Sequence, residues 1–236
     1  MSHLEKASAE LAANSPPALY SASASASQPQ YYRKLGNPGP LGLFGFASTT
    51  FILSMYNVQA RGIATPNVVV GMALFVGGLA QFVAGMWEFA CQNTFGATAF
   101  TMYGGFWMSF GTVFIPGSGI LDSYTTNGVL DADELNSALG IYLWTWFIVT
   151  FLLLIGSLRK NMGLIVLFFF LTITFALLGA GKFSKDNAVA LTKAGGSLGI
   201  VTAFVAFYVG TAELLSDRSS SWFVLPLGPI PKGRVD

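Results

Sequence analysis

The fold is decided by residues 141–181, IYLWTWFIVTFLLLIGSLRKNMGLIVLFFFLTITFALLGAG. Two apolar runs, 141–158 and 162–181, are separated here by the short polar stretch Arg-Lys-Asn. Each run is close to the ~20 residues that a helix needs to cross the hydrocarbon core of a bilayer. Neither run shows the alternation that is typical of a strand in a membrane β-barrel. Because lipid offers no partner to a free backbone group, the two runs predict two membrane-spanning helices.

The composition of the whole chain favours the same class of protein. Of the 236 residues, 53% are hydrophobic and 10% are charged, whereas soluble domains are about 25% charged. The net charge of +1 leaves no basic patch for binding nucleic acid. The single cysteine, Cys91, excludes an intrachain disulfide and a multi-cysteine metal site, and the single histidine, His3, lies in the N-terminal segment. We therefore expect no metal and no other cofactor.

Working outward from the two runs, we find six apolar segments and predict an all-α membrane protein with six transmembrane helices. The segments are 41–60, 68–87, 97–115, 140–158, 162–181 and 195–215. They place the transmembrane domain at 37–216. Residues 1–36 are rich in Ser, Ala and Pro and lack the apolar core of a signal peptide, so we expect a disordered tail there. Residues 217–236 form a second, short tail.

Six crossings put both chain ends on one side of the membrane, and the basic residues indicate which side. The side with the ends would hold seven of them: Arg33, Lys34, Arg159, Lys160, Arg218, Lys232 and Arg234. The other side would hold four: Arg61, Lys182, Lys185 and Lys193. Because cytoplasmic loops carry the excess of basic residues, this count favours cytoplasmic termini. The long loop 116–139 would then lie outside, with a short surface helix starting near Asp131.

Acidic residues within the spans are few. Glu88 closes the second span and Glu213 closes the sixth. An ionisable residue in a membrane segment is a candidate for proton or substrate passage, although a carboxylate at the interface can also simply be hydrated. The spans contain no histidine pair, no paired acids and no nucleophile beside a base, so we do not expect an enzyme.

Uncharged polar side chains are spread over at least five of the spans. They are Thr49, Thr50, Gln81, Thr98, Thr101, Tyr103, Thr172, Thr174 and Thr202. A single threonine can bond its own helix backbone. Nine such groups fit better with a hydrogen-bonding path through the membrane, and a small neutral acid would cross it with little desolvation.

The first span begins with the sequence LGNPGPLGLFGF. Asn37 is a suitable N-cap, and Pro38 or Pro40 fits the first turn, where a missing N–H has no cost. The remaining free N–H groups could hold a small anion, and an ordinary helix start explains the sequence equally well. Small residues in VGGLAQFVAG and GGSLGIVTA predict closely packed helices, either within one chain or between copies.

These residues carry a resemblance to a known family. The stretch NPGPLGLFGF resembles the signature of the acetate uptake transporters, which include the bacterial succinate–acetate permease and its fungal relatives. The similarity continues through GGLAQFVAGMWEF, NTFGATAFTMYGGFW, GIYLWTWFIVTF and FFFLTITFALL. It covers roughly residues 35–228, and the long Ser-rich tail is similar to that of fungal members.

The resemblance implies a multi-pass plasma-membrane protein of six-helix protomers, assembled as a homo-hexamer with a separate route through each. It implies acetate and related short monocarboxylates as substrates, moved with protons or by channel-like passage. By motif, the constriction of the route falls on Phe46, Tyr103 and Leu171. Signature or matching positions of the substrate path are Asn37, Pro38, Gln81, Glu88 and Thr98, and Thr49, Thr50 and Thr101 join them as path residues.

Two other functions stay open at this point. Fungal members of the family have been linked to ammonium export, but a cation path should show acidic groups in the membrane, and Glu88 and Glu213 are the candidates. The second alternative is an acetate sensor that does not transport. It would signal through its tail, and the chain has no sizeable soluble output domain.

Overall fold

The computed structural model describes His3, Lys6, residues 35–216 and residues 221–231. Contacts divide the chain into two units, Met1–Leu35 and Gly36–Asp236. Most of the predicted disordered tail at 1–36 lies outside the described residues. The same holds for 217–220 and 232–236 of the predicted C-terminal tail.

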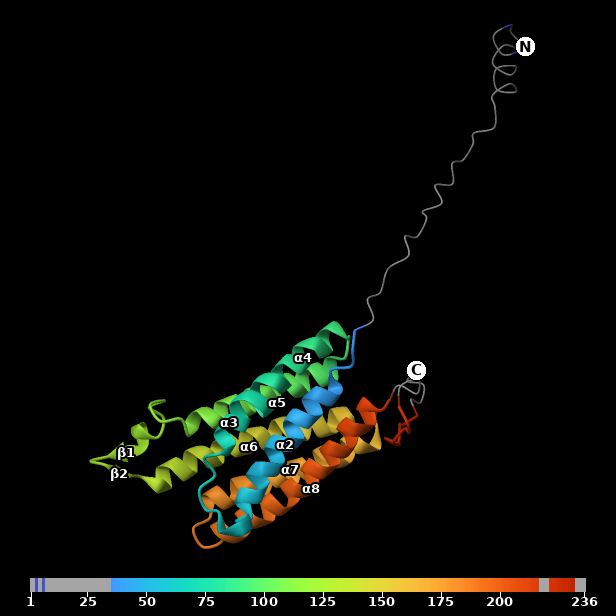
Figure 1. Ribbon diagram of the computed structural model, residues 1–236. Coiled ribbons are helices and arrows are strands. Elements are labelled where there is room, and N and C mark those ends of the chain that lie inside the picture. Colours follow the sequence, from blue (N-terminus) through green and yellow to red (C-terminus); the bar gives the residue numbers. More distant parts are fainter. Residues whose placement is uncertain (1–2, 4–5, 7–34, 217–220, 232–236) are drawn as a thin grey trace. The chain divides into compact units, whose positions relative to one another are not determined.

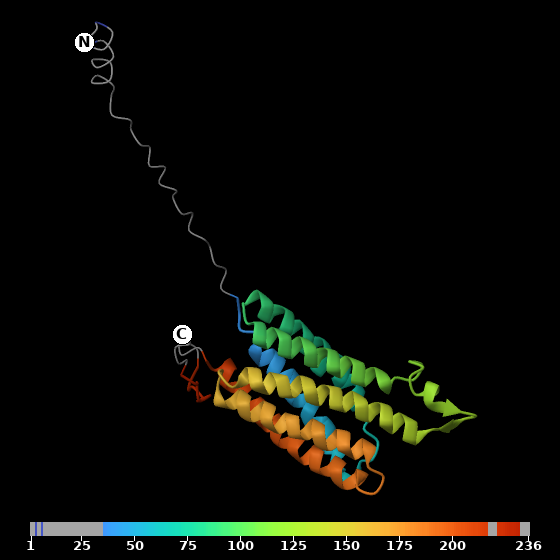
Figure 2. The same ribbon diagram turned by 180° about the vertical axis from the view of Figure 1, so that it is seen from behind.

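The second unit is built from helices (Figures 1 and 2). Its described residues form six helical rods, and a π-helical segment, η2, interrupts the second rod. In chain order the rods are α2 (Gly39–Asn57); α3 (Val69–Leu74), η2 (Phe75–Ala80) and α4 (Gln81–Ala90); α5 (Thr94–Val113); α6 (Ala132–Ser157); α7 (Met162–Phe183); and α8 (Ala188–Leu214). Two short 3-10 turns, η1 (Ala60–Gly62) and η3 (Asp122–Tyr124), lie in the loops.

Four of the described rods are long and apolar enough to cross a membrane. They are Val69–Ala90, Ala132–Ser157, Met162–Phe183 and Ala188–Leu214. The other two, α2 and α5, are 19 and 20 residues long but contain more glycine and hydroxyl residues, which lowers their hydropathy. The chain is therefore an α-helical, multi-pass membrane protein.

The prediction of a separate surface helix in the loop 116–139 is wrong. Helix α6 begins at Ala132 and continues without a break to Ser157. Its start is fixed by Asp131, whose side chain accepts a hydrogen bond from the backbone N–H of Glu134 at 3.0 Å. Before it, a small hairpin pairs β1 (Thr125–Thr126) with β2 (Val129–Leu130), which the sequence analysis missed.

Three pairs of successive helices pack side by side, α4 with α5, α6 with α7 and α7 with α8, and α2 packs against α8. Glycines permit two of the closest approaches. A Cβ on Gly104 of α5 would stand 2.8 Å from the backbone nitrogen of Phe82 in α4. One on Gly199 of α8 would collide with the Ser54 hydroxyl of α2. The small-residue stretch in α8 thus serves packing within the chain.

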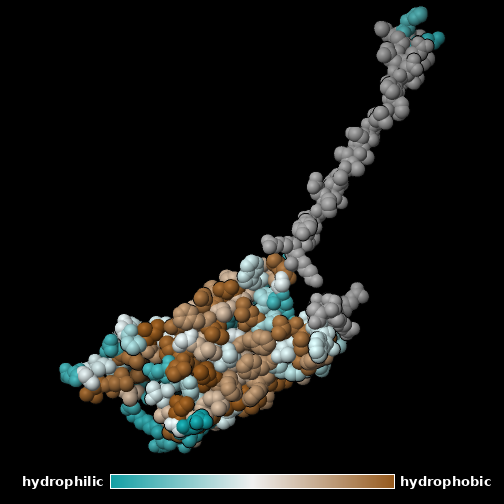
Figure 3. Space-filling view, viewed as in Figure 1, coloured by the Kyte–Doolittle hydropathy of each residue, from teal (hydrophilic) through white to brown (hydrophobic). Residues whose placement is uncertain are grey.

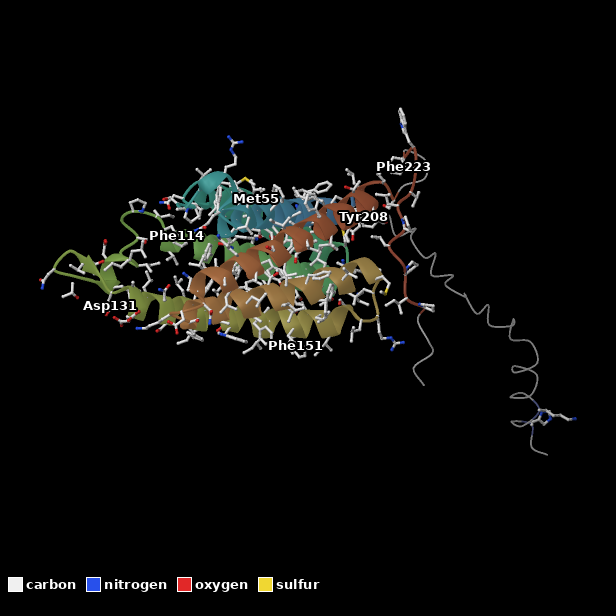
Figure 4. All side chains as sticks on the ribbon, turned by 90° about the horizontal axis from the view of Figure 1, so that it is seen from below. Met55, Phe114, Asp131, Phe151, Tyr208 and Phe223 are labelled. Carbon is white, nitrogen blue, oxygen red and sulfur yellow. The ribbon has the colours of Figure 1, made fainter. Side chains whose placement is uncertain are left out.

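The outer face of the bundle is apolar along its flank and hydrophilic toward its ends (Figure 3). Large side chains such as Phe75, Ile141 and Phe204 are more than half exposed, and Phe151 points outward from α6 (Figure 4). Asp131 and Phe223 mark the two opposite ends of the bundle (Figure 4). An apolar flank with polar ends is the surface that a bilayer accepts.

Residues 221–231 lie against the start of α7. The N–H of Met162 donates to the carbonyl of Gly228 at 2.9 Å, and the N–H of Gly163 donates to the carbonyl of Leu227 at 3.2 Å. The Tyr208 hydroxyl donates to the carbonyl of Pro226 at 2.6 Å. This segment therefore supplies acceptors to the free N–H groups at the start of α7.

Candidate transport path

Two cavities lie within the bundle and share one lining residue, Phe46. The first is lined by Glu88 and Glu213, so we call it the glutamate cavity. The second is lined by Lys182, so we call it the lysine cavity. Glu88 lies at the end of α4 and Lys182 at the end of α7, and these two helices run in opposite directions. The cavities therefore extend toward opposite ends of the bundle.

The three residues of the predicted constriction line these cavities, and Phe46 lies between them. Tyr103 lines the glutamate cavity, Leu171 lines the lysine cavity and Phe46 lines both. The rings of Phe46 and Tyr103 have centroids 5.4 Å apart, and all three side chains are buried. Apolar and aromatic groups therefore separate the two cavities.

A side-chain hydrogen bond fixes the ring of Tyr103. Its hydroxyl lies 2.8 Å from the hydroxyl of Thr150 in α6. The Thr150 hydroxyl donates its own proton to the carbonyl of Trp146 at 2.6 Å, so Tyr103 is the donor of the first bond. The sequence analysis did not identify Thr150, because chain spacing does not reveal which face of α6 meets α5.

In the glutamate cavity, the side chain of Asn93 both caps helix α5 and binds the acidic side chain of Glu88. Its Oδ1 accepts a hydrogen bond from the N–H of Gly96 at the start of α5, at 3.2 Å. Its Nδ2 donates to Oε2 of Glu88 at 2.8 Å. Glu88 is only 4% exposed, and Glu213 lines the same cavity. The two carboxyl groups, from α4 and α8, therefore act on one small volume.

The start of α2 differs from the prediction by one residue. Pro38 occupies the N-cap position, and the Oδ1 of Asn37 accepts a hydrogen bond from the N–H of Gly39 at 2.9 Å. Pro40 lies in the first turn, as expected. A Cβ on Gly39 would collide with Oε2 of Glu213. The helix start at which a small anion was considered thus lies against the protein's own carboxyl group.

The predicted path residues separate into two groups. Gln81 lines the glutamate cavity and Thr50 lines the lysine cavity. Both are buried, and among the described residues neither Gln81 Oε1 nor Thr50 Oγ1 has a hydrogen-bond partner. Buried polar atoms without a partner in the protein are suited to meet a polar substrate or water.

Most other hydroxyls of the predicted path lie outside the linings of these two cavities, and the exception is Thr174, which lines the lysine cavity. Thr49 packs beside Gly77, and Thr101 packs beside Gly85. Thr98 is exposed and donates to the carbonyl of Thr94 at 2.8 Å. Like Thr98, Thr172, Thr174 and Thr202 each donate to a carbonyl four residues earlier in their own helix. The last four threonines, Thr98, Thr172, Thr174 and Thr202, therefore bond within their own helices.

Lys182 is a lining residue that the sequence analysis used only in a charge count. Its Nζ donates to Oδ1 of Asn136 at 3.1 Å. Three residues later, Lys185 forms an ion pair with Asp133, and the hydrogen bond and the negative charge of that carboxylate raise the pKa of Lys185. Lys182 directly follows the apolar segment 162–181. This position of a positive charge was the feature of the sequence that could have identified Lys182 as a site residue.

Among the described residues, no group of three or more His, Cys, Asp or Glu side chains could hold a metal ion. What the described site offers instead is a pair of carboxyl groups, an apolar and aromatic partition, and a lysine on the far side.

The chain is similar to several known proteins. "Ammonia transport outward protein 2" of Saccharomyces cerevisiae is 46% identical over 198 residues, which cover 84% of this chain and 68% of that protein. "Succinate-acetate/proton symporter SatP" of Escherichia coli is 35% identical over 196 residues, which cover 83% of this chain and 96% of that protein. A solved structure, "Structure of the bacterial acetate channel SatP", superposes with a TM-score of 0.70 at 36% identity, covering 83% of this chain and 100% of that one. Residues 20–232 match the GPR1/FUN34/yaaH family as a whole, and the chain belongs to that family.

Proposed function

We propose that this chain transports acetate and other short monocarboxylates across the plasma membrane, together with protons. In this proposal all six rods span the lipid bilayer, both termini are cytoplasmic, and six copies assemble into a hexamer with one path through each copy. The observation that carries the proposal is the pair of cavities that approach each other at Phe46. The names of the similar proteins, an acetate channel and a succinate-acetate/proton symporter, support the choice of substrate.

The partition between the cavities selects the solute. Phe46, Tyr103 and Leu171 form a constriction that offers no charge and little hydrogen bonding, because the Tyr103 hydroxyl is already bonded to Thr150. A hydrated ion would have to lose its water there, while a small neutral acid loses far less. Gln81 and Thr50 offer hydrogen bonds on the two sides, and Asn37 with Pro38 sets the start of α2 beside the glutamate cavity.

Protons enter this scheme through Glu88 and Glu213. Carboxyl groups can take up or release a proton, and both of these line the cavity that borders the constriction. A carboxylate that crosses as the neutral acid needs a proton donor on one side and an acceptor on the other. The pair Glu88 and Glu213 supplies such a group on the side that we assign to the cytoplasm.

The proposal is tested by uptake of labelled acetate into proteoliposomes of the purified full-length protein, with and without an inward proton gradient. Protein-free liposomes are the control, because undissociated acid crosses lipid unaided. Uptake above this control, raised by the gradient beyond the change in acid speciation, would support proton-coupled transport. Uptake that follows the acetate gradient alone would indicate a channel, and no excess uptake by folded protein would contradict the proposal.

Export of ammonia is the second candidate, and the similarity to the ammonia transport outward protein favours it. The glutamate cavity could receive a cation, but Lys182 lines the other cavity and would oppose one. Labelled methylammonium in the same proteoliposomes separates the two functions. We expect flux of acetate and none of methylammonium, and the reverse result would establish the export function.

A further inference from the structure

We infer that the lysine cavity is a binding site for a small monocarboxylate in its anionic form, with Lys182 as the residue that recognises its charge. The inference rests on the proposed function, because it assumes that a carboxylate enters the path. It adds which end of the path takes the charged form and which side chains meet it.

The charge of the cavity is the first argument. Lys182 is the one charged residue in its described lining, and no acidic residue lines it. The hydrogen bond of Lys182 is made with Asn136, a neutral amide, and no ion pair of Lys182 occurs among the described residues. The nearby Asp133 is already paired with Lys185. The positive charge of Lys182 is therefore available to a ligand.

Two further donors line the same cavity without a partner. The side chain of Trp107 is only 2% exposed, and that of Thr50 is 6% exposed. Among the described residues, neither Trp107 Nε1 nor Thr50 Oγ1 forms a hydrogen bond. An indole N–H can only donate, so it requires an acceptor such as a carboxylate oxygen or water. The three groups belong to α7, α5 and α2, and all three line the lysine cavity.

The rest of the lining suits the hydrocarbon part of such a ligand. Aromatic and aliphatic side chains form most of the wall, among them Phe106, Phe110 and Leu143. Apolar walls also strengthen the attraction between the lysine and a carboxylate, because charges interact more strongly where water is excluded.

Acidic groups do lie outside this cavity, on the surface beyond Lys182. Asp131, Asp133 and Glu134 line a separate shallow depression that also includes Lys182 and Lys185. They belong to the loop and the first turn of α6 and are exposed to water, where screening by salt weakens their effect on a ligand inside the cavity.

Lys182 also has a structural role to be separated from binding. It lies in the last turn of α7, where a positive charge stabilises the negative end of the helix dipole. Removing the charge would weaken folding through this contact without changing which solutes bind. The test therefore compares a charged solute with a neutral one of the same shape.

The experiment measures binding of labelled acetate and labelled acetamide to the purified full-length protein by NMR. Acetamide has nearly the shape of acetate and no charge. In Lys182→Met we expect the Kd of acetate to rise about tenfold or more, the loss expected for a hydrogen bond to a charged group, with the Kd of acetamide unchanged. Lys182→Arg should keep most of the preference for acetate. Lys193→Met removes an exposed lysine of α8 that does not line the cavity, so this variant should bind like the wild type.

Three results would overturn the inference: equal acetate binding by wild type and Lys182→Met, equal loss of acetate and acetamide binding, or no acetate binding by the wild type. Thermal unfolding of each variant shows that the comparison concerns folded protein. Uptake in proteoliposomes keeps the two proposals apart. Normal acetate uptake with an unchanged KM in Lys182→Met refutes this site alone, whereas charge-selective binding without uptake refutes the transport function alone.

Discussion

At the scale of single residues, the constriction makes the sharpest prediction. Leu171→Ala should widen the partition, because the side chain lines the lysine cavity, as Phe46 does, and is only 3% exposed. We expect the ratio of lactate to acetate uptake to rise several-fold in proteoliposomes. Leu167→Ala is the matched control, since Leu167 is equally buried one turn away but lines only the glutamate cavity. An unchanged ratio in Leu171→Ala would remove it from the constriction.

A second prediction concerns the acidic pair. Glu213→Gln keeps the size of the side chain and removes its ability to exchange a proton, so we expect acetate uptake to lose its stimulation by an inward proton gradient. Glu134→Gln, an exposed acid at the opposite end of the bundle, should keep the stimulation. If Glu213→Gln responds to the gradient like the wild type, the proton is carried elsewhere.

At the scale of elements, the start of α2 is tested by adding one methyl group. In Gly39→Ala the new Cβ would occupy the position of Glu213 Oε2, so the helix or the carboxyl group has to move. Overpacking of this kind costs about 1–3 kcal/mol. The control Gly36→Ala adds a Cβ with no atom within 4 Å and should be neutral. Thermal unfolding measures both, and equal midpoints would contradict the close contact.

Helix positions were the part of the fold that the sequence predicted well, because apolar runs of spanning length leave little choice of structure in lipid. The start of α6 was missed because its first turns are polar and were treated as a separate surface element. The hairpin was missed although Asn127 and Gly128, both with positive φ, form the Asn-Gly pair that is typical of tight hairpin turns. The π-helical segment η2 has no comparable sequence signal.

The candidate site was predicted less evenly. Phe46, Tyr103 and Leu171 came from the family resemblance, and the residues alone gave no reason to group them. Thr150 and Lys182 were missed because hydropathy does not show which faces of α5, α6 and α7 meet. Thr98 was taken as a path residue from its motif, whereas its side chain is exposed and bonded to its own helix. Polar residues within the spans can be recognised from the sequence. The direction in which their side chains point is known only once the packing of the helices is known.

At the scale of the whole molecule, labelling of the single cysteine can show which side of the membrane the chain ends face. Cys91 is exposed near the turn between α4 and α5, and its Sγ lies 3.7 Å from the carbonyl of Gly36. If the termini are cytoplasmic, a membrane-impermeant thiol reagent should leave Cys91 unlabelled in intact cells and label it after permeabilisation. In Cys91→Ala with Asn127→Cys, the hairpin residue should be labelled in intact cells. The opposite pattern in both proteins would reverse the topology.

The two cavities are lined by ionisable groups of opposite kind, two acids in one and a lysine in the other, on either side of an uncharged partition. Because the groups on the two sides differ in kind, acetate meets a kinetically different entrance on each face of the barrier. Without a proton gradient, the path cannot drive net flow between equal chemical potentials of acetate, so the asymmetry appears in the half-saturating concentrations instead. Acetate offered from the lysine side should saturate transport at a lower concentration than acetate offered from the glutamate side. Such a molecule would scavenge a scarce solute from one face while releasing it readily at the other.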